Sequence, residues 1–137
     1  AYEIPKRDWN SDVCSSDLLN KYALFKFIKF LRDELNLESP FKVQLVTNRS
    51  DDLKTYAYYD PNSGLVKVYC KDRGLADVLR SVAHELIHHL QNQRGELNQP
   101  VPDVGGKIED EANAVAGQLV KKFGYANPDL AIYGKSL

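Results

Sequence analysis

The stretch Leu75–Arg94 reads LADVLRSVAHELIHHLQNQR, and it decides how the rest of the chain is arranged. Apolar side chains recur in it at the spacing of a helix with one buried face, and they are Leu79, Val82, Ala83, Leu86 and Leu90. An adjoining stripe carries polar side chains, namely Asp77, Ser81, His84 and His88. Gly95 follows and predicts the end of the helix. We therefore expect a helix that packs one side into the core and lies under a cleft.

His84, Glu85 and His88 form the pattern H-E-x-x-H within this helix. Two histidines four residues apart lie one above the other on one helix face. Both imidazoles can therefore reach one cation at the bond length of about 2.0–2.1 Å that zinc requires. Glu85 follows the first histidine and can act on a metal-activated water without being a ligand. The pattern is typical of zinc metalloproteases, and it predicts a Zn²⁺ site.

The third zinc ligand is not obvious, because the chain has only one other histidine, His89. His89 comes one residue after His88, so it points about 100° away on a helix of 3.6 residues per turn. We interpret it as a solvated or hydrogen-bonded histidine. The metzincin continuation H-x-x-G-x-x-H is absent, since Gln91 and Arg94 occupy its Gly and His positions. The third ligand must then be a carboxylate or a cysteine.

A second helix is expected at residues 108–123, which read IEDEANAVAGQLVKKF and are followed by Gly124 as the stop. Its predicted buried face consists of Ile108, Ala112, Val115, Ala116, Leu119 and Phe123. Glu109 and Asn113 lie one turn apart at one border of that face, and Glu111 lies at the opposite border. Acidic residues also suit the first turn of a helix because of its dipole. We expect Glu109 to be the third ligand, with Glu111 as the alternative.

Together, His84-Glu85-Leu86-Ile87-His88 and Glu109-Asp110-Glu111-Ala112-Asn113 resemble the gluzincin pattern of H-E-x-x-H with a downstream E-x-x-A-[D/N]. The E-x-E-A-N form is similar to the ImmA/IrrE-like metallopeptidases, which phages and mobile elements often encode. The resemblance covers at most residues 65–123. It implies zinc held by two histidines and one glutamate, a catalytic Glu85, peptide-bond hydrolysis, and an Asn113 that orients a ligand histidine. Val115 replaces the family's usual phenylalanine, and no histidine follows His89 to serve as oxyanion donor.

The remaining segments predict an α+β fold in a single domain, 1–137. Residues 18–37 show the helical period, and residues 41–47 alternate as in a half-buried strand. Residues 54–59 and 65–70 are β-rich runs on either side of the turn sequence DPNSG, which is typical of a hairpin. We expect a minimal zincin-like domain with a mostly antiparallel three-stranded sheet. In it, residues 65–70 form an edge strand that lines the cleft and pairs with an extended peptide.

The functional hypothesis is zinc-dependent peptide hydrolysis of a peptide or protein substrate, with Glu85 as general base. Tyr125, Tyr133 and Arg94 are the candidates for a second oxyanion donor. One alternative is a non-catalytic zinc-stabilised module that binds a peptide or partner, in which Cys70 is a fourth ligand of a closed site. Another is a regulator that binds its partner through the helix at residues 18–37.

Composition limits the other classes of function. The net charge of −1 gives no indication of nucleic-acid or membrane binding, and no apolar run is long enough to span a bilayer. The first ten residues lack the apolar region of a signal peptide, which favours the cytoplasm. Cys14 and Cys70 are interpreted as free thiols. Residues 11–18, SDVCSSDL, resemble the translation of a sequencing-library adapter, so we expect an inserted, exposed connection there.

Overall fold

The computed structural model describes residues 18–48, 56–97 and 106–134. The described elements, in chain order, are helix α1 (Leu18–Glu34), strands β1 (Lys42–Val46), β2 (Ala57–Asp60) and β3 (Leu65–Tyr69), helices α2 (Leu75–Gln93) and α3 (Gly106–Ala126), and the 3₁₀ turns η2 (Pro128–Leu130) and η3 (Ile132–Gly134). The expected α+β class is therefore confirmed. Residues 1–17 lie outside the described residues. The expectations of an inserted, exposed connection at residues 11–18 and of a missing signal peptide in the first ten residues therefore stay predictions.

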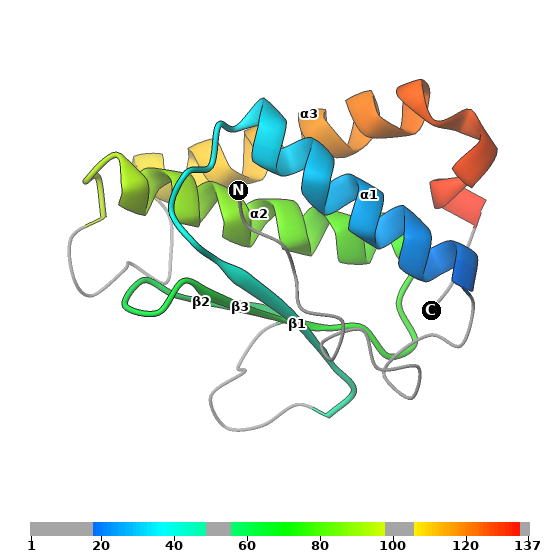
Figure 1. Cartoon of the computed structure of the whole chain (residues 1–137), viewed down its shortest axis with the longest axis horizontal. Coiled ribbons are helices and arrows are strands. Elements are labelled where there is room, and N and C mark those ends of the chain that lie inside the picture. Colours follow the sequence, from blue (N-terminus) through cyan, green and yellow to red (C-terminus); the bar gives the residue numbers. More distant parts are fainter. Residues whose placement is uncertain (1–17, 49–55, 98–105, 135–137) are drawn as a thin grey trace.

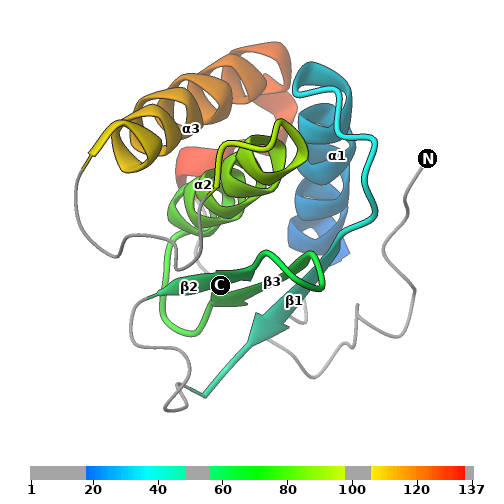
Figure 2. The ribbon, with the colours of Figure 1, turned by 90° about the vertical axis from the view of Figure 1, so that its left-hand side faces the viewer.

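The helices cover one face of the sheet (Figures 1 and 2). Helix α2 lies next to the strands, α3 packs on its side away from the sheet, and α1 lies beside it. Val66 and Val68 of β3 are fully buried under α2, as expected for alternate side chains on the covered face of a strand. α2 consequently contacts the sheet on one side and the other two helices elsewhere on its surface. Side chains from most of its circumference are therefore buried.

The sheet order is β1-β3-β2, with β1 parallel and β2 antiparallel to β3. The sheet is thus mixed and not mostly antiparallel. The prediction that residues 65–70 form an edge strand is wrong, since β3 pairs on both sides. The hairpin signal correctly joins β2 to β3. The hairpin signal does not predict which of its two strands pairs with β1, because β1 and β3 are far apart in the sequence.

The β2–β3 turn depends on a glycine. Asp60 Oδ1 accepts a hydrogen bond from the backbone N–H of Asn62 (3.0 Å), and Gly64 follows with φ +74°. A Cβ at Gly64 would lie 2.6 Å from the carbonyl oxygen of Pro40, so no other residue fits without moving the backbone. The turn therefore holds the hairpin against the segment that enters β1.

Two helix ends differ from the sequence-based expectation. α1 ends at Glu34 and not at residue 37, because Asn36 adopts a left-handed conformation (φ 53°) and the N–H of Leu37 bonds back to Arg32 O. α3 continues past Gly124 to Ala126. A Cβ at Gly124 would lie 3.2 Å from side-chain carbons of Ile132 and Tyr133. Gly124 therefore allows the tail to pack closely and does not stop the helix.

One core joins the helices and the sheet. Phe27 of α1 meets Phe123 of α3 edge to face, with ring centroids 5.0 Å apart. Ile132 of the tail is also buried in this core, although the tail shows no clear period in the sequence. Cys70 is disulfide-bonded, so its interpretation as a free thiol is wrong, and Cys14 lies outside the described residues.

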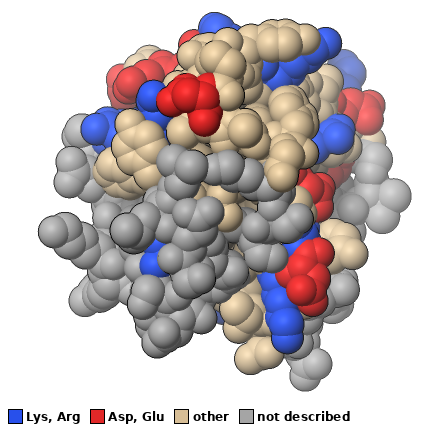
Figure 3. All heavy atoms as spheres, turned by 90° about the vertical axis from the view of Figure 1, so that its right-hand side faces the viewer, with Lys and Arg blue, Asp and Glu red and all other residues tan. Residues whose placement is uncertain are grey.

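Neither the surface charge on one face nor the helices single out a strongly charged partner or a membrane among the described residues. On the face seen in Figure 3, the basic and acidic side chains of the described residues are interspersed. Among the described residues, no helix is both long and apolar enough to cross a membrane.

Candidate metal centre

Arg73 fixes the start of α2, the helix that carries the H-E-x-x-H pattern. Its side chain is buried, and its Nη1 donates a hydrogen bond to Tyr69 O (2.6 Å) at the end of β3. Nη2 donates to Ser81 Oγ (2.7 Å) two turns along the helix, and an ion pair joins the guanidinium to Asp77 (2.9 Å). The first turns of α2 are thereby held to the sheet, and the direction of the helix is set.

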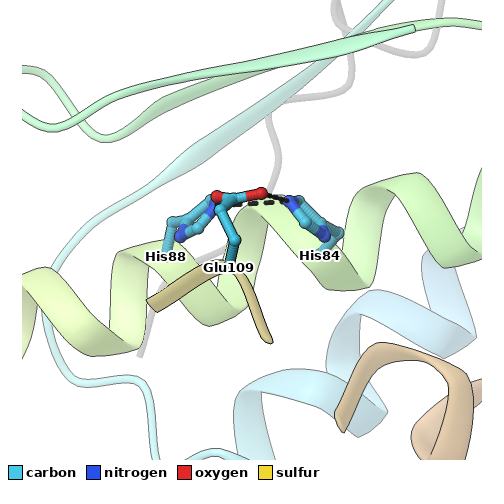
Figure 4. Close-up of side chains that lie close together, drawn as sticks. All are labelled: His84, His88 and Glu109. Carbon is cyan, nitrogen blue, oxygen red and sulfur yellow. Dashed lines mark hydrogen bonds and ion pairs between the residues drawn. The ribbon is translucent and has the colours of Figure 1, made fainter. Parts of the chain in front are cut away.

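His84 and His88 lie on the same side of α2 and face each other (Figure 4). Their rings are 4.8 Å apart at 87°, and the two Nε2 atoms are 3.2 Å apart. His88 is almost fully buried, while the side chain of His84 is 20% exposed. The pair therefore presents two ring nitrogens to one point that solvent reaches from the His84 side.

Glu109 projects from the first turns of α3 toward the two histidines (Figure 4). Its Oε1 lies 2.7 Å from His88 Nε2, and its Oε2 lies 3.4 Å from His84 Nε2. The small, fully buried Ala112 and Ala116 line the same side of α3, which lets the two helices approach closely. The structure thus brings together the three residues that the sequence analysis selected as ligands.

The spacing of these donor atoms suits a metal ion. His84, His88 and Glu109 each offer one atom, and the three atoms lie within 4.8 Å of one another. Ligand atoms of a tetrahedral site with bonds of about 2.0–2.1 Å lie about 3.3–3.4 Å apart, close to the 3.2 and 3.4 Å found for two of the three pairs. The 2.7 Å contact is that of a charge-assisted hydrogen bond, whose proton a bound cation would replace.

Glu85 lies beside this group and is not part of it. Its Oε1 is 4.0 Å from His84 Nε2, and the residue is 8% exposed. Burial, with a smaller contribution from the charge of Glu109, raises the pKa of Glu85 to about 8 in the metal-free protein. A buried carboxyl group with such a pKa is suited to accepting and releasing a proton near neutral pH.

His84 is held in its neutral form. Burial and the neighbouring His88 lower its pKa, while Glu109 and a hydrogen bond with Asn113 oppose this effect in part. A neutral imidazole is the form that binds a metal. Asn113 is thus close enough to His84 to affect its pKa.

Glu111, the alternative ligand, points elsewhere. Its carboxylate accepts a hydrogen bond from Gln91 Nε2 (2.8 Å) and lies 3.8 Å from Arg94 Nη1. Gln91 was missed as a site residue, although it also bonds to His88 Nδ1 (2.8 Å). Its only sequence signal is a polar residue one turn after His88 on a side of the helix that turns out to be buried.

The candidates for an oxyanion donor are not brought to the site. Tyr125 lies 16 residues after Glu109 on the same helix, which separates their Cα atoms by about 24 Å. Tyr133 packs against Gly124 at that far end. Arg94 is exposed and pairs with Glu96 and Glu111.

Cys70 is not a fourth ligand. The group found among the described residues consists of His84, His88 and Glu109. Cys70 is disulfide-bonded, and only a thiolate sulfur is a zinc ligand. Cys70 therefore does not join the group of His84, His88 and Glu109.

No family model, curated protein or solved structure matches this chain.

Proposed function

We propose that this protein hydrolyses peptide bonds with a zinc ion held by His84, His88 and Glu109. The observation that carries the proposal is the convergence of their three donor atoms, within 4.8 Å of one another, from two helices. Two imidazoles and one carboxylate are a donor set of catalytic zinc sites, in which three protein ligands leave a fourth position open. The resemblance of the two motifs to gluzincins, and to ImmA/IrrE-like metallopeptidases in particular, supports the same class and a zincin-like fold.

Glu85 is the general base of the proposed reaction. When bound, zinc supplies a Lewis acid that acidifies a water molecule and polarises the scissile carbonyl. The Glu85 carboxylate takes the proton of the attacking water and delivers a proton to the leaving amine. Its position 4.0 Å from His84 Nε2 keeps it next to the reacting atoms without making it a ligand. A cation nearby favours the ionised form of a carboxyl group, which counteracts the burial that raises its pKa.

The other residues hold the ligands in place. The charge of Glu109 compensates the cation, and its position between two Nε2 atoms fixes the distance between α2 and α3 at this point. Asn113, one turn after Glu109, interacts with His84 and favours its protonated form, and in the proposed site it orients that ring. Metal ligands are commonly oriented in this way by neighbouring polar groups.

Zinc content and proteolysis of an unfolded, fluorescently labelled protein substrate test the proposal. Wild type is expected to bind about one zinc per chain and to release labelled peptides. Glu109→Ala should lose the zinc, while Glu111→Ala, two residues away on the same helix, should keep it. The reverse result would move the third ligand to Glu111.

Glu85→Gln separates a catalytic site from a non-catalytic, zinc-stabilised binding module. It should keep both zinc and fold, and its proteolytic rate should fall by a factor of about 10²–10⁴, as expected for loss of a general base. Full activity in this variant would refute the role of Glu85. A wild-type protein that binds zinc but cleaves no substrate would favour the binding module.

A further inference from the structure

Gln91 is the most completely buried polar residue among the described parts of the chain, with 0% of its surface exposed. It lies on α2 one turn after His88 and faces α3. A buried amide needs partners for both its oxygen and its nitrogen, because an unsatisfied polar group in the interior is costly. All the polar atoms of its side chain have such partners.

The partners fix which way the amide points. Gln91 Nε2 donates to Ile108 O (3.0 Å) and to Glu111 Oε1 (2.8 Å), and these two oxygens only accept hydrogen bonds. The remaining atom, Oε1, lies 2.8 Å from His88 Nδ1. Since Oε1 is only an acceptor, His88 Nδ1 must carry the hydrogen.

This hydrogen bond decides which nitrogen of His88 is available to a metal. In a neutral imidazole one nitrogen carries the hydrogen and the other has the free lone pair. Gln91 holds a hydrogen at Nδ1, so the nitrogen that can offer a lone pair, once a cation replaces the proton shared with Glu109, is Nε2, the atom that faces His84 and Glu109. Without Gln91, the hydrogen of a neutral ring would favour Nε2, where the Glu109 carboxylate accepts it at 2.7 Å.

The same side chain also ties the two ligand helices together. Ile108 immediately precedes Glu109, so the bond from Gln91 Nε2 to Ile108 O holds the backbone next to the third ligand. The bond to Glu111 holds the next turn of the same segment of α3. One residue of α2 therefore contacts a ligand on its own helix and the backbone beside the ligand on the other.

We propose that Gln91 is a positioning residue that holds His88 in its metal-binding tautomer and sets Glu109 at coordinating distance. This inference rests on the proposed zinc site, but its effect on His88 exists in the metal-free protein as well. Loss of a hydrogen-bond partner behind a ligand histidine lowers metal affinity by a factor of about 10–100.

Gln93 offers a matched control on the same helix. Like Gln91 it makes three side-chain hydrogen bonds, but all three are to backbone groups. Its Oε1 accepts from the N–H of Glu38 (2.8 Å) and Ser39 (3.0 Å), and its Nε2 donates to Asn36 O (3.1 Å). None of these groups belongs to the metal centre. Gln91→Met and Gln93→Met therefore remove an equal number of bonds from the same helix, and they differ in what those bonds hold.

The first measurement is the zinc dissociation constant, obtained by competition with a chromophoric chelator. Gln91→Met should bind zinc about 10–100-fold more weakly than wild type, and Gln93→Met should not differ from wild type. A folded Gln91→Met protein with the affinity of wild type would overturn the proposal, as would an equal loss in both variants.

The second measurement reads the tautomer of His88 in metal-free protein by long-range ¹H–¹⁵N correlation of the imidazole rings. Wild type should carry a hydrogen at Nδ1, and Gln91→Met should lose that hydrogen and carry one only at Nε2, opposite Glu109. Gln91→Glu keeps an acceptor opposite Nδ1, and as a protonated carboxyl group it also keeps a donor opposite Ile108 O and Glu111. It should keep the hydrogen at Nδ1, which provides a test if Gln91→Met does not fold. A His88 ring without a hydrogen at Nδ1 in wild type or in Gln91→Glu would refute the proposed role.

The two measurements separate this inference from the proposed function. A wild-type protein that binds no zinc, yet shows the expected tautomers, would refute the zinc site and support the orientation of His88 by Gln91. A protein that binds zinc with the same tautomer in wild type and in Gln91→Met would support the zinc site and refute the role of Gln91.

Discussion

His88 and His89 are neighbours in the sequence and both are buried, but they face different parts of the molecule. His88 faces α3: Gln91 of its own helix accepts a hydrogen bond from its Nδ1, and Glu109 of α3 contacts its Nε2. His89 faces the hairpin and the segment before β1. Its Nδ1 lies 2.8 Å from Tyr59 Oη of β2, and its Nε2 lies 3.0 Å from Ser39 O, between α1 and β1. The two imidazoles thus have entirely different hydrogen-bond partners.

The partners impose opposite tautomers on the two rings. Ser39 O only accepts, so His89 carries its hydrogen at Nε2, and its Nδ1 accepts from the Tyr59 hydroxyl. Neither nitrogen of His89 is left for a metal. The rotation of about 100° per helical residue therefore separates a metal-binding histidine from a structural one. We call the side of α2 that carries His88 the metal side, and we call the side that carries His89 the hairpin side.

Replacing each histidine in turn tests this difference between the two sides of α2 most directly. His88→Ala should reduce the bound zinc to the background level, because two protein ligands remain of three. His89→Ala should keep the zinc and lower the free energy of unfolding by about 1–3 kcal/mol for the polar group left without a partner. Metal analysis and urea denaturation measure the two effects. Loss of zinc in a folded His89→Ala protein would show that the two sides are not independent.

Glu85 supplies a second test, which concerns the metal-free protein. Its pKa of about 8 in the folded state lies above the ordinary value of 4.5, so between these pH values the folded state holds a proton that the unfolded chain releases. The free energy of unfolding should then fall as the pH rises from about 4.5 to 8, by about 1.4 kcal/mol for each pH unit of difference between the two pKa values. The full effect is several kcal/mol.

Glu85→Gln removes this titration from the metal-free protein. In the presence of a chelator, the variant should match wild type near pH 4.5 and be the more stable protein at pH 8. Urea denaturation of both proteins across this range measures the difference, and other titrating groups cancel in the comparison. Parallel stability curves would contradict the burial of an isolated carboxyl group at this position.

Local patterns predicted the parts of the fold that depend on residues close in the sequence. The spacing of apolar residues predicted α2, and the spacing of the two histidines predicted that they share one face of it. The position of Glu109 at the border of a buried face with small residues predicted that it lies near them. The pairing of β1 with β3 could not be read in this way, because it joins segments about twenty residues apart. Gln91 was missed for a similar reason. Its role depends on Ile108 O and Glu111 across the helix interface, which no spacing along α2 reveals.

Tyr59→Phe tests the hairpin side with the smallest expected effect. The Tyr59 hydroxyl donates to His89 Nδ1 and accepts from Asn92 Nδ2 (3.1 Å). Burial raises its pKa, which keeps the hydroxyl hydrogen in place as a donor. Without the hydroxyl, Asn92 keeps its bond to Pro61 O (2.9 Å), while His89 Nδ1 loses its partner. The free energy of unfolding should fall by about 1 kcal/mol, as measured by urea denaturation.

The control for this change is Tyr58→Phe, since Tyr58 is on the same strand and is exposed. This variant should have the stability of wild type. Both variants should bind zinc with wild-type affinity, because the lost hydroxyl on the hairpin side touches no ligand. If Tyr59→Phe weakened zinc binding as much as Gln91→Met, the metal side would depend on the hairpin side. The division of α2 into two independent sides, inferred from the opposite tautomers of His88 and His89, would then be wrong.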